Sequence, residues 1–157
     1  MHFHLVGSVR GSYVKKCAIH HSFNRAVAIH AVDHLQVLNN VVYDIRGMSF
    51  FTEDGVERFT VMEDNLAVLT RSLWSLLIVD QTPAQFWFTN MQSYIRRNVA
   101  AGSSHFGFWF RPLDHPDGLS ETKKYCPDEA PLGAFIDNVA HTTGEWGYCW
   151  GYVHKER

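Results

Sequence analysis

An asparagine that recurs at one place in a repeated pattern restricts the fold of this 157-residue chain more than any other feature. The pattern surrounds five anchor positions: Cys17, Asn40, Asn65, Asn98 and Asn138. The residue three before each anchor is apolar, the residue one before it is polar, and the next residue is apolar again. Stacked apolar columns in units of roughly 20 to 30 residues are typical of a solenoid.

The short units predict an all-β solenoid, a parallel β-helix of about five coils. Each unit has room for two or three short strands, and the anchor asparagines fall at a fixed bend. Strands on successive coils lie about 4.8 Å apart, so that stacked asparagines can form a hydrogen-bonded ladder. We expect one domain or fragment over residues 1–157, with insertions at about 69–85 and 112–131. The second insertion is rich in Pro, Asp and Gly, which predicts a surface loop.

An amphipathic helix at residues 66–79 is an alternative for the first insertion. The leucines there fall near the i, i+3, i+4 spacing of a helix; they are Leu66, Leu69, Leu73, Leu76 and Leu77.

Composition excludes several classes of function. The formal net charge is −2 and no Lys/Arg cluster is present, so no nucleic-acid partner is predicted. The longest apolar run is interrupted by Arg71 and is too short to span a bilayer, and the first residues do not form a signal peptide. The three cysteines form no CxxC pair, and a disulfide between Cys126 and Cys149 stays open.

Positions counted from the anchors predict which side chains face outward. The column ten residues after the anchors is expected to point inward; it contains Val27, Phe50, Ser75, Phe108 and Tyr148. Two columns then face outward because side chains alternate along a strand. The first contains Ala28, Phe51, Leu76, Trp109 and Cys149. The second contains His30, Glu53, Ile78, Arg111 and Gly151.

These outward columns favour a glycan-binding face. An exposed Trp109 beside His30, Glu53 and Arg111 could stack on a sugar ring and bind its hydroxyl or carboxylate groups. In the alternative interpretation, Trp109 packs beneath the loop that follows, and Arg111 pairs with a nearby aspartate, Asp114 or Asp117.

A second candidate site consists of histidines and acids at the bends. His20 and His21 occupy bend positions that correspond to Tyr43 and Asp44 in the next coil and to His141 further along. His21, Asp44 and Glu53 are the candidates for general acid–base catalysis. Arg25 and Asp54 could position a uronate carboxylate. Turn chemistry explains the same histidines without catalysis.

No cofactor is predicted. The motif "HFH" places His2 and His4 on one face of a strand, but no third metal ligand can be identified from the sequence. The motif "EDG" at residues 53–55 resembles the start of a calcium loop without its remaining ligands, so calcium is possible but no motif supports it.

Several stretches resemble the β-helix region of the fibrocystin-L family, which the hyaluronan-binding family involved in cell migration shares. They include "SYVKKCAIHHSFNRAVAIH", "NNVVYDIRGMSFFTEDGVE" and "GSSHFGFWFRPLDHPDG". The resemblance implies a right-handed parallel β-helix at the cell surface or outside the cell. It also implies a place within a larger protein, between further coils, and a link to glycans such as hyaluronan.

Three functions remain open. The first is a coat or receptor-like scaffold that binds a glycan or an extracellular protein. The second is an enzyme that depolymerises a hyaluronan-like polymer, with His21, Asp44 and Glu53 as candidate catalytic residues. The third is a structural spacer.

Overall fold

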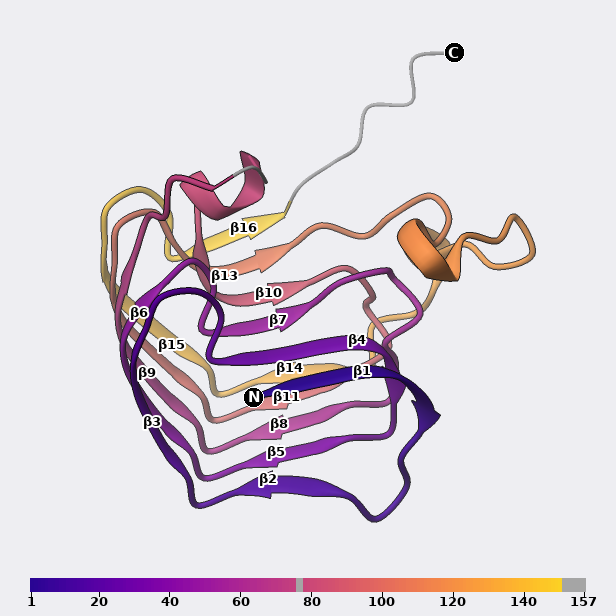
Figure 1. The fold of residues 1–157 in the computed structure, drawn as a ribbon, viewed down its shortest axis with the longest axis horizontal. Helices are drawn as coiled ribbons and strands as arrows, with labels where there is room; N and C mark the ends of the chain where they lie inside the picture. Colours follow the sequence, from indigo (N-terminus) through magenta and orange to yellow (C-terminus); the bar gives the residue numbers. More distant parts are fainter. Residues whose placement is uncertain (76–77, 151–157) are drawn as a thin grey trace.

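The chain winds through three parallel β-sheets, in a computed structural model that describes residues 1–75 and 78–150 (Figure 1). This architecture is a right-handed parallel β-helix, which confirms the predicted all-β class. Two sheets contain five strands and the third contains six, in agreement with about five coils. Among the described residues, no helix is long and apolar enough to cross a membrane.

The three sheets are here called A, B and C. Sheet A contains β1 (His2–Ser8), β4 (Val27–Asp33), β7 (Phe50–Thr52), β10 (Ala84–Phe88), β13 (Phe106–Phe110) and β16 (Tyr148–Trp150). Sheet B contains β2 (Tyr13–Lys15), β5 (Gln36–Leu38), β8 (Val61–Glu63), β11 (Tyr94–Arg96) and β14 (Ala134–Ile136). Sheet C contains β3 (Ala18–Ser22), β6 (Val41–Arg46), β9 (Leu66–Arg71), β12 (Val99–Ser103) and β15 (Val139–Thr143).

Aromatic rings stack along the axis inside the helix. Phe50, Phe86 and Phe108 pair in register on β7, β10 and β13, and all three are fully buried. Consecutive rings in this stack are 4.7 Å apart and nearly parallel. This separation matches the distance between neighbouring strands, so each coil buries its apolar face on the next coil.

The anchor asparagines form the predicted ladder, here called the inner ladder (Asn40, Asn65, Asn98 and Asn138). The Nδ2 groups of the first three donate to the Oδ1 of the next asparagine, at 2.9, 2.9 and 3.0 Å in sequence order. The same Nδ2 groups also donate to a main-chain carbonyl of the preceding coil, such as that of Val37 for Asn65. Asn40, Asn65 and Asn98 are at most 1% exposed. The inner ladder therefore satisfies buried donors and acceptors that water cannot reach.

The residue before each anchor adopts the left-handed backbone conformation in all five coils. These residues are Lys16, Asn39, Asp64, Arg97 and Asp137, with φ between 52° and 56°. None of them is glycine, although this conformation is unfavourable for side chains other than Asn and Asp. The bend between sheets B and C is thus repeated with the same geometry in every coil.

The inward and outward positions that were predicted by counting residues from Asn65 are wrong for the third coil. The register places Phe86, Trp87 and Phe88 of β10 beside β13, where Ser75 and its successors were expected. The cause is the segment 72–83 between β9 and β10, which shifts every later position of this coil. Of the residues misassigned in this coil, Leu76 and the side chain of Ile78 lie outside the described residues. In the fifth coil, Cys149 pairs with Trp109 as the columns predict, and its side chain and Gly151 lie outside the described residues.

The helical alternative for residues 66–79 is wrong where the structure describes it. Residues Leu66–Arg71 form strand β9, and a 3-10 helix, η1, spans only Ile78–Gln81. Leu76 and Leu77 of that alternative lie outside the described residues. Cys126, left open as a disulfide partner, is a free cysteine.

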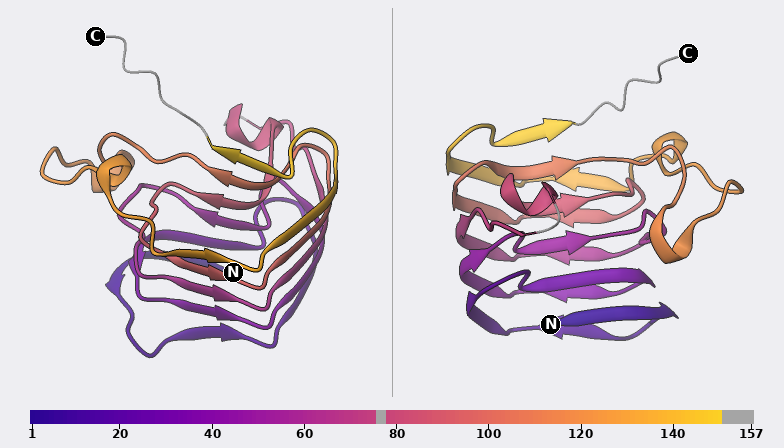
Figure 2. Two further views of the ribbon diagram at one scale, coloured as in Figure 1. Left: turned by 180° about the vertical axis from the view of Figure 1, so that it is seen from behind. Right: turned by 45° about the horizontal axis from the view of Figure 1, so that its top comes forward.

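Two segments project from the coils near the same face of sheet A. The segment with η1 lies above the ends of sheet A, and the segment between β13 and β14 projects beyond the coils (Figure 2). The second segment contains η2 (Gly118–Ser120) and η3 (Pro127–Glu129). Together, the two segments turn an otherwise regular sheet surface into a recessed one.

Candidate functional site

A pocket of about 240 Å³ lies on the outer face of sheet A, between the two projecting segments. Val79 borders it from the first segment, and Leu113, Asp117 and Gly118 border it from the second. Four residues singled out from the sequence also line this pocket: Arg25, Glu53, Asp54 and Arg111. The fold thus brings together charged side chains that are up to 86 positions apart (25 to 111) in the chain.

His30 connects two of these carboxylates. Its Nε2 lies 2.8 Å from Oδ2 of Asp54, and its Nδ1 lies 3.5 Å from Oε2 of Glu53. His30 is 7% exposed and Asp54 is 3% exposed, so the hydrogen bond between them is shielded from water. A buried carboxylate of this kind fixes the tautomer and the orientation of an imidazole ring.

Arg25 lies over the ring of Phe51, with 4.0 Å between its Cζ and the ring centroid. Its Nη2 donates to Oδ1 of Asp80, at 3.2 Å. Its buried Nε has no hydrogen-bond partner within the described part of the chain. A buried donor without a partner requires an explanation, and a ligand acceptor in the pocket would provide one.

Arg111 has no ion pair within 4 Å among residues 1–75 and 78–150. The expected pairing with Asp114 or Asp117 does not form. The positive charge of Arg111 acts only at longer range, where it works to lower the pKa of Asp117. Partial burial and the charge of Asp54 outweigh that influence and raise the pKa of Asp117 above its ordinary value. The pocket therefore combines a cation without a close partner with a carboxyl group that binds a proton more readily than usual.

Trp109 is half-buried, so the expectation of an exposed aromatic ring is not met. Its ring stacks on that of Trp87 at 5.1 Å and meets the edge of Phe106 at 4.1 Å. Trp87, which the sequence analysis missed because of the shifted third coil, lines the pocket in its place. The Nε1 of Trp109 is buried and has no hydrogen-bond partner in the described part of the protein.

Glycine and tyrosine hold the second segment against the coils. A Cβ atom on Gly118, whose φ is +59°, would lie 2.8 Å from Oδ1 of Asp54, so only glycine permits this approach. The hydroxyl group of Tyr125 lies 2.8 Å from Nδ2 of Asn90, which also donates to the carbonyl of Gly55. These contacts place the wall of the pocket directly over Asp54.

Glu57 supports the site from below and was missed in the sequence. Its carboxylate is fully buried and accepts hydrogen bonds from the backbone N–H groups of Ala31, Asp54 and Gly55. Burial raises the pKa of Glu57 in spite of these hydrogen bonds. The only signal in the sequence is an acid shortly after "EDG", which also fits an exposed turn.

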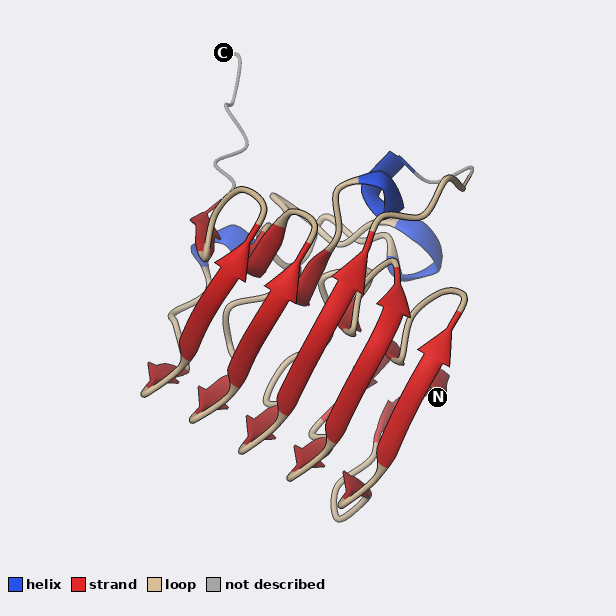
Figure 3. Cartoon of the chain, turned by 90° about the vertical axis from the view of Figure 1, so that its left-hand side faces the viewer, coloured by secondary structure: helices blue, strands red, loops and turns tan. Residues whose placement is uncertain are grey.

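His21 and Asp44 lie elsewhere, on sheet C, whose strands face the viewer in Figure 3. Their side chains are 3.9 Å apart, and His20 Nδ1 is 2.8 Å from His21 Nδ1. Oδ1 of Asp44 accepts from Arg71 at 2.9 Å. His141 lies on β15, three strands away from Tyr43. The three candidate catalytic residues therefore do not share one site, since Glu53 belongs to the pocket on sheet A.

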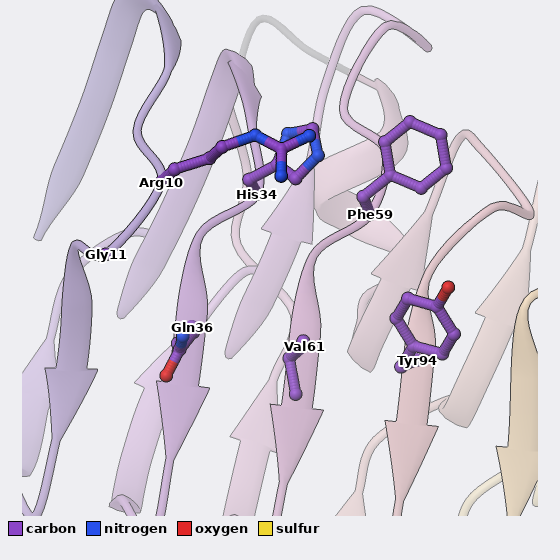
Figure 4. A pocket seen from close by; sticks show the side chains of 7 residues that line it. All are labelled: Arg10, Gly11, His34, Gln36, Phe59, Val61 and Tyr94. Carbon is purple, nitrogen blue, oxygen red and sulfur yellow. The ribbon is translucent and has the colours of Figure 1, made fainter.

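A wider hollow of about 550 Å³ lies on sheet B, and none of the candidates lines it (Figure 4). Its walls include Arg10 and His34 at the bends, and Gln36, Val61 and Tyr94 from successive strands. Asp33 binds the ring of His34 at 2.6 Å. Two buried hydroxyl groups without a hydrogen-bond partner among the described residues, Oγ1 of Thr60 and Oγ of Ser93, directly precede Val61 and Tyr94 in the chain, but neither residue lines the hollow.

Comparison with known proteins places this fold in a family. The family description "CEMIP beta-helix" matches residues 1–148. Fibrocystin-L is 50% identical in Mus musculus and 48% identical in Homo sapiens, each over 94% of this chain. The human cell migration-inducing and hyaluronan-binding protein is 31% identical over 90% of the chain.

The chain covers only a small part of these relatives. It spans 4% of the length of either fibrocystin-L and 13% of the human hyaluronan-binding protein. A Danio rerio relative named cell surface hyaluronidase is 31% identical over 94% of the chain, which spans 13% of it. With a family match over nearly all of its residues and this fold, the chain belongs to the CEMIP β-helix family.

Proposed function

We propose that this chain is the β-helix module of a cell-surface or extracellular protein and that it binds an acidic glycan of the hyaluronan type. The binding site is the pocket lined by Arg25, Glu53, Trp87 and Arg111. The names of two relatives, which refer to hyaluronan binding and to a cell surface hyaluronidase, support the class of ligand.

The observation that carries the proposal is the unpaired polar groups in and beside a recessed, aromatic pocket. Arg111 has no close acid partner among the described residues, and the Nε of Arg25 has no acceptor there. An arginine fork binds a carboxylate in two places, as a uronate requires. Glu53 and Asp117 offer acceptors for sugar hydroxyl groups, and Trp87, which is only 3% exposed, contributes an apolar edge to the pocket.

Cleavage of the glycan in the same pocket is the second candidate function. Glycoside hydrolysis uses two carboxyl groups in different protonation states. The raised pKa of Asp117, beside the buried and histidine-bound Asp54, favours such a difference. Of the catalytic candidates from the sequence, this function retains Glu53 and assigns no role to His21 or Asp44.

The test is gel analysis of fluorescent hyaluronan and chondroitin after incubation with the purified chain, with and without calcium. We expect the polymer to migrate more slowly at unchanged length. Shortened polymer would instead establish the second candidate function. Polymer that is neither retarded nor shortened, with a chain that is β-rich by circular dichroism, would contradict both and leave a protein-binding module or a spacer.

A matched pair of arginine variants locates the binding site. Arg111→Ala should weaken retardation about tenfold, which corresponds to the loss of one charge-assisted contact of about 1.4 kcal/mol. Arg46→Ala removes an exposed arginine at the end of β6 on sheet C and should have no effect. Equal losses in both variants would show that binding is non-specific attraction to positive charge.

A further inference from the structure

Three imidazole rings meet at one end of the outer face of sheet A. His2 and His4 point outward from β1, two residues apart. The register pairs His4 with His30 of β4 and His2 with Ala28. One ring nitrogen from each histidine can be chosen so that all three lie within 4.8 Å of one another. His30 is thus the third ligand that could not be identified from the sequence.

The hydrogen bond between His30 and Asp54 leaves the other ring nitrogen of His30 for a further ligand. Its Nε2 is held by the buried carboxylate of Asp54, so Nδ1 is the nitrogen that remains for a ligand. In many metal sites a carboxylate accepts a hydrogen bond from the ring nitrogen of a histidine whose other nitrogen binds the metal. The pairing of His30 with Asp54 therefore has the form expected for a metal-binding histidine.

Glu53 is close to His30, although it does not belong to the cluster of three histidine nitrogens within 4.8 Å of one another. Its Oε2 lies 3.5 Å from His30 Nδ1, which is long for a hydrogen bond. Zinc binds imidazole nitrogen and carboxylate oxygen at about 2.0–2.2 Å, so two ligand atoms of one tetrahedral ion lie about 3.4 Å apart. The observed separation fits two ligands of a shared ion. His2 and His4 are exposed, and their rings contact each other at 5.0 Å between centroids.

We propose that His2, His4, His30 and Glu53 form a binding site for a divalent transition metal of the zinc class, with Asp54 as a positioning residue. Nitrogen donors favour zinc over calcium, which takes oxygen ligands. The metal site shares Glu53 and Asp54 with the pocket of the proposed glycan function, whereas His2, His4 and His30 belong to the metal site alone. An ion there would lie at the edge of the pocket and would neutralise the charge of Glu53.

The experiment is calorimetric titration of the tag-free, EDTA-treated and dialysed 157-residue chain with zinc sulfate near neutral pH. We expect one ion per chain. Cobalt(II) should give the intense visible absorption of a tetrahedral site, and zinc should remove it. An absence of zinc binding, or calcium binding that depends on His4, would overturn the proposal.

Variants assign the ligands. His4→Ala removes an exposed ring and should lower the zinc affinity more than about 100-fold, whereas Asp54→Asn should lower it about 10- to 100-fold. The control is the double variant His20→Ala/His21→Ala, which removes the other close histidine pair and should bind zinc normally. Binding that survives in His4→Ala and disappears in the double variant would overturn the assignment.

Replacement of the buried His30 can disturb folding, so the ligand set is tested at more exposed residues. His2→Ala and Glu53→Gln alter more exposed ligands, and circular dichroism of both variants should match that of the unaltered chain. We expect the thermal midpoint of the unaltered chain to rise with zinc and that of His2→Ala to rise less. An equal rise in the two proteins would contradict the proposed ligand set.

Discussion

The inner ladder and the outer face of sheet A are built from the same coils but differ in what is repeated. Inside, asparagine follows asparagine and phenylalanine follows phenylalanine, with every ring and amide stacked on its equivalent. Outside, one column changes at every coil and contains His4, His30, Glu53, Thr89 and Arg111, whereas the column beside it contains the aromatic rings of Phe51, Trp87 and Trp109. Repetition of the inner positions stabilises the solenoid, which leaves the outer positions free to vary with the ligand.

The largest expected effect is on stability, from a substitution in the inner ladder. Asn65→Ala removes four hydrogen bonds: two that Nδ2 donates and two that Oδ1 accepts from Asn40. Since buried groups are left without partners, we expect the free energy of unfolding to fall by about 4 kcal/mol. Asn138→Ala, at a half-buried position, should cost less. Urea denaturation measures both free energies of unfolding. Equal losses in the two variants would refute the idea that burial of the asparagine determines the size of the effect.

The next effect is on binding alone and sharpens the contrast between inside and outside. Gly118→Ala forces a Cβ atom against Asp54 at a left-handed position, so the wall of the pocket must shift. We expect glycan retention to fall at least about fivefold, while the free energy of unfolding changes by about 1 kcal/mol. Gly11→Ala is the control, because its φ is also positive but its Cβ atom would meet nothing within 4 Å.

A smaller effect is expected from pH. The pKa of Asp117 is raised by partial burial and by Asp54, so this carboxyl group gains its proton before ordinary aspartates as the pH falls. Loss of that negative charge beside Arg111 should strengthen retention of a polyanion at mildly acidic pH. Retention should rise as the pH falls toward the raised pKa, and Asp117→Asn should flatten the curve. A curve of the same shape in both proteins would mean that another group titrates.

The smallest effect is expected on sheet C. His21 is 62% exposed at its side chain and lies 3.9 Å from Asp44, which is already bound to Arg71. His21→Ala should therefore change neither stability nor glycan retention by more than about 0.5 kcal/mol. If that variant abolished depolymerisation by a chain that shortens hyaluronan, the catalytic site would belong to sheet C.

The fold could be predicted from the sequence because its main constraint is local and repeated. An asparagine three residues after an apolar residue and one after a polar residue marks four of the five coils, and Cys17 takes this place in the first. The third coil was misaligned because segment 72–83 is an insertion, after which β10 returns to the same columns as the other coils. Such an insertion is tolerated because a longer loop costs little free energy. The aromatic pair Phe86 and Trp87, which resembles Phe108 and Trp109, was the correct landmark.

The site could be predicted only in part. The outward column correctly contained His30, Glu53 and Arg111, since alternation along a strand is a property of the backbone. The pocket itself depends on how two irregular segments pack over that column, which no periodicity encodes. The same limit explains why Trp109 was expected to be exposed and why Glu57 was missed.

The left-handed residue before each anchor also protects the chain against errors of register. If one coil slipped by a single residue, Leu38 or Ile136 would have to adopt φ near +55°, which is costly for such side chains. The same slip in the other direction would bring an apolar residue such as Val41 or Leu66 into the line of buried amides. A misaligned coil therefore meets a penalty at the bend and another in the interior, and both favour the native register.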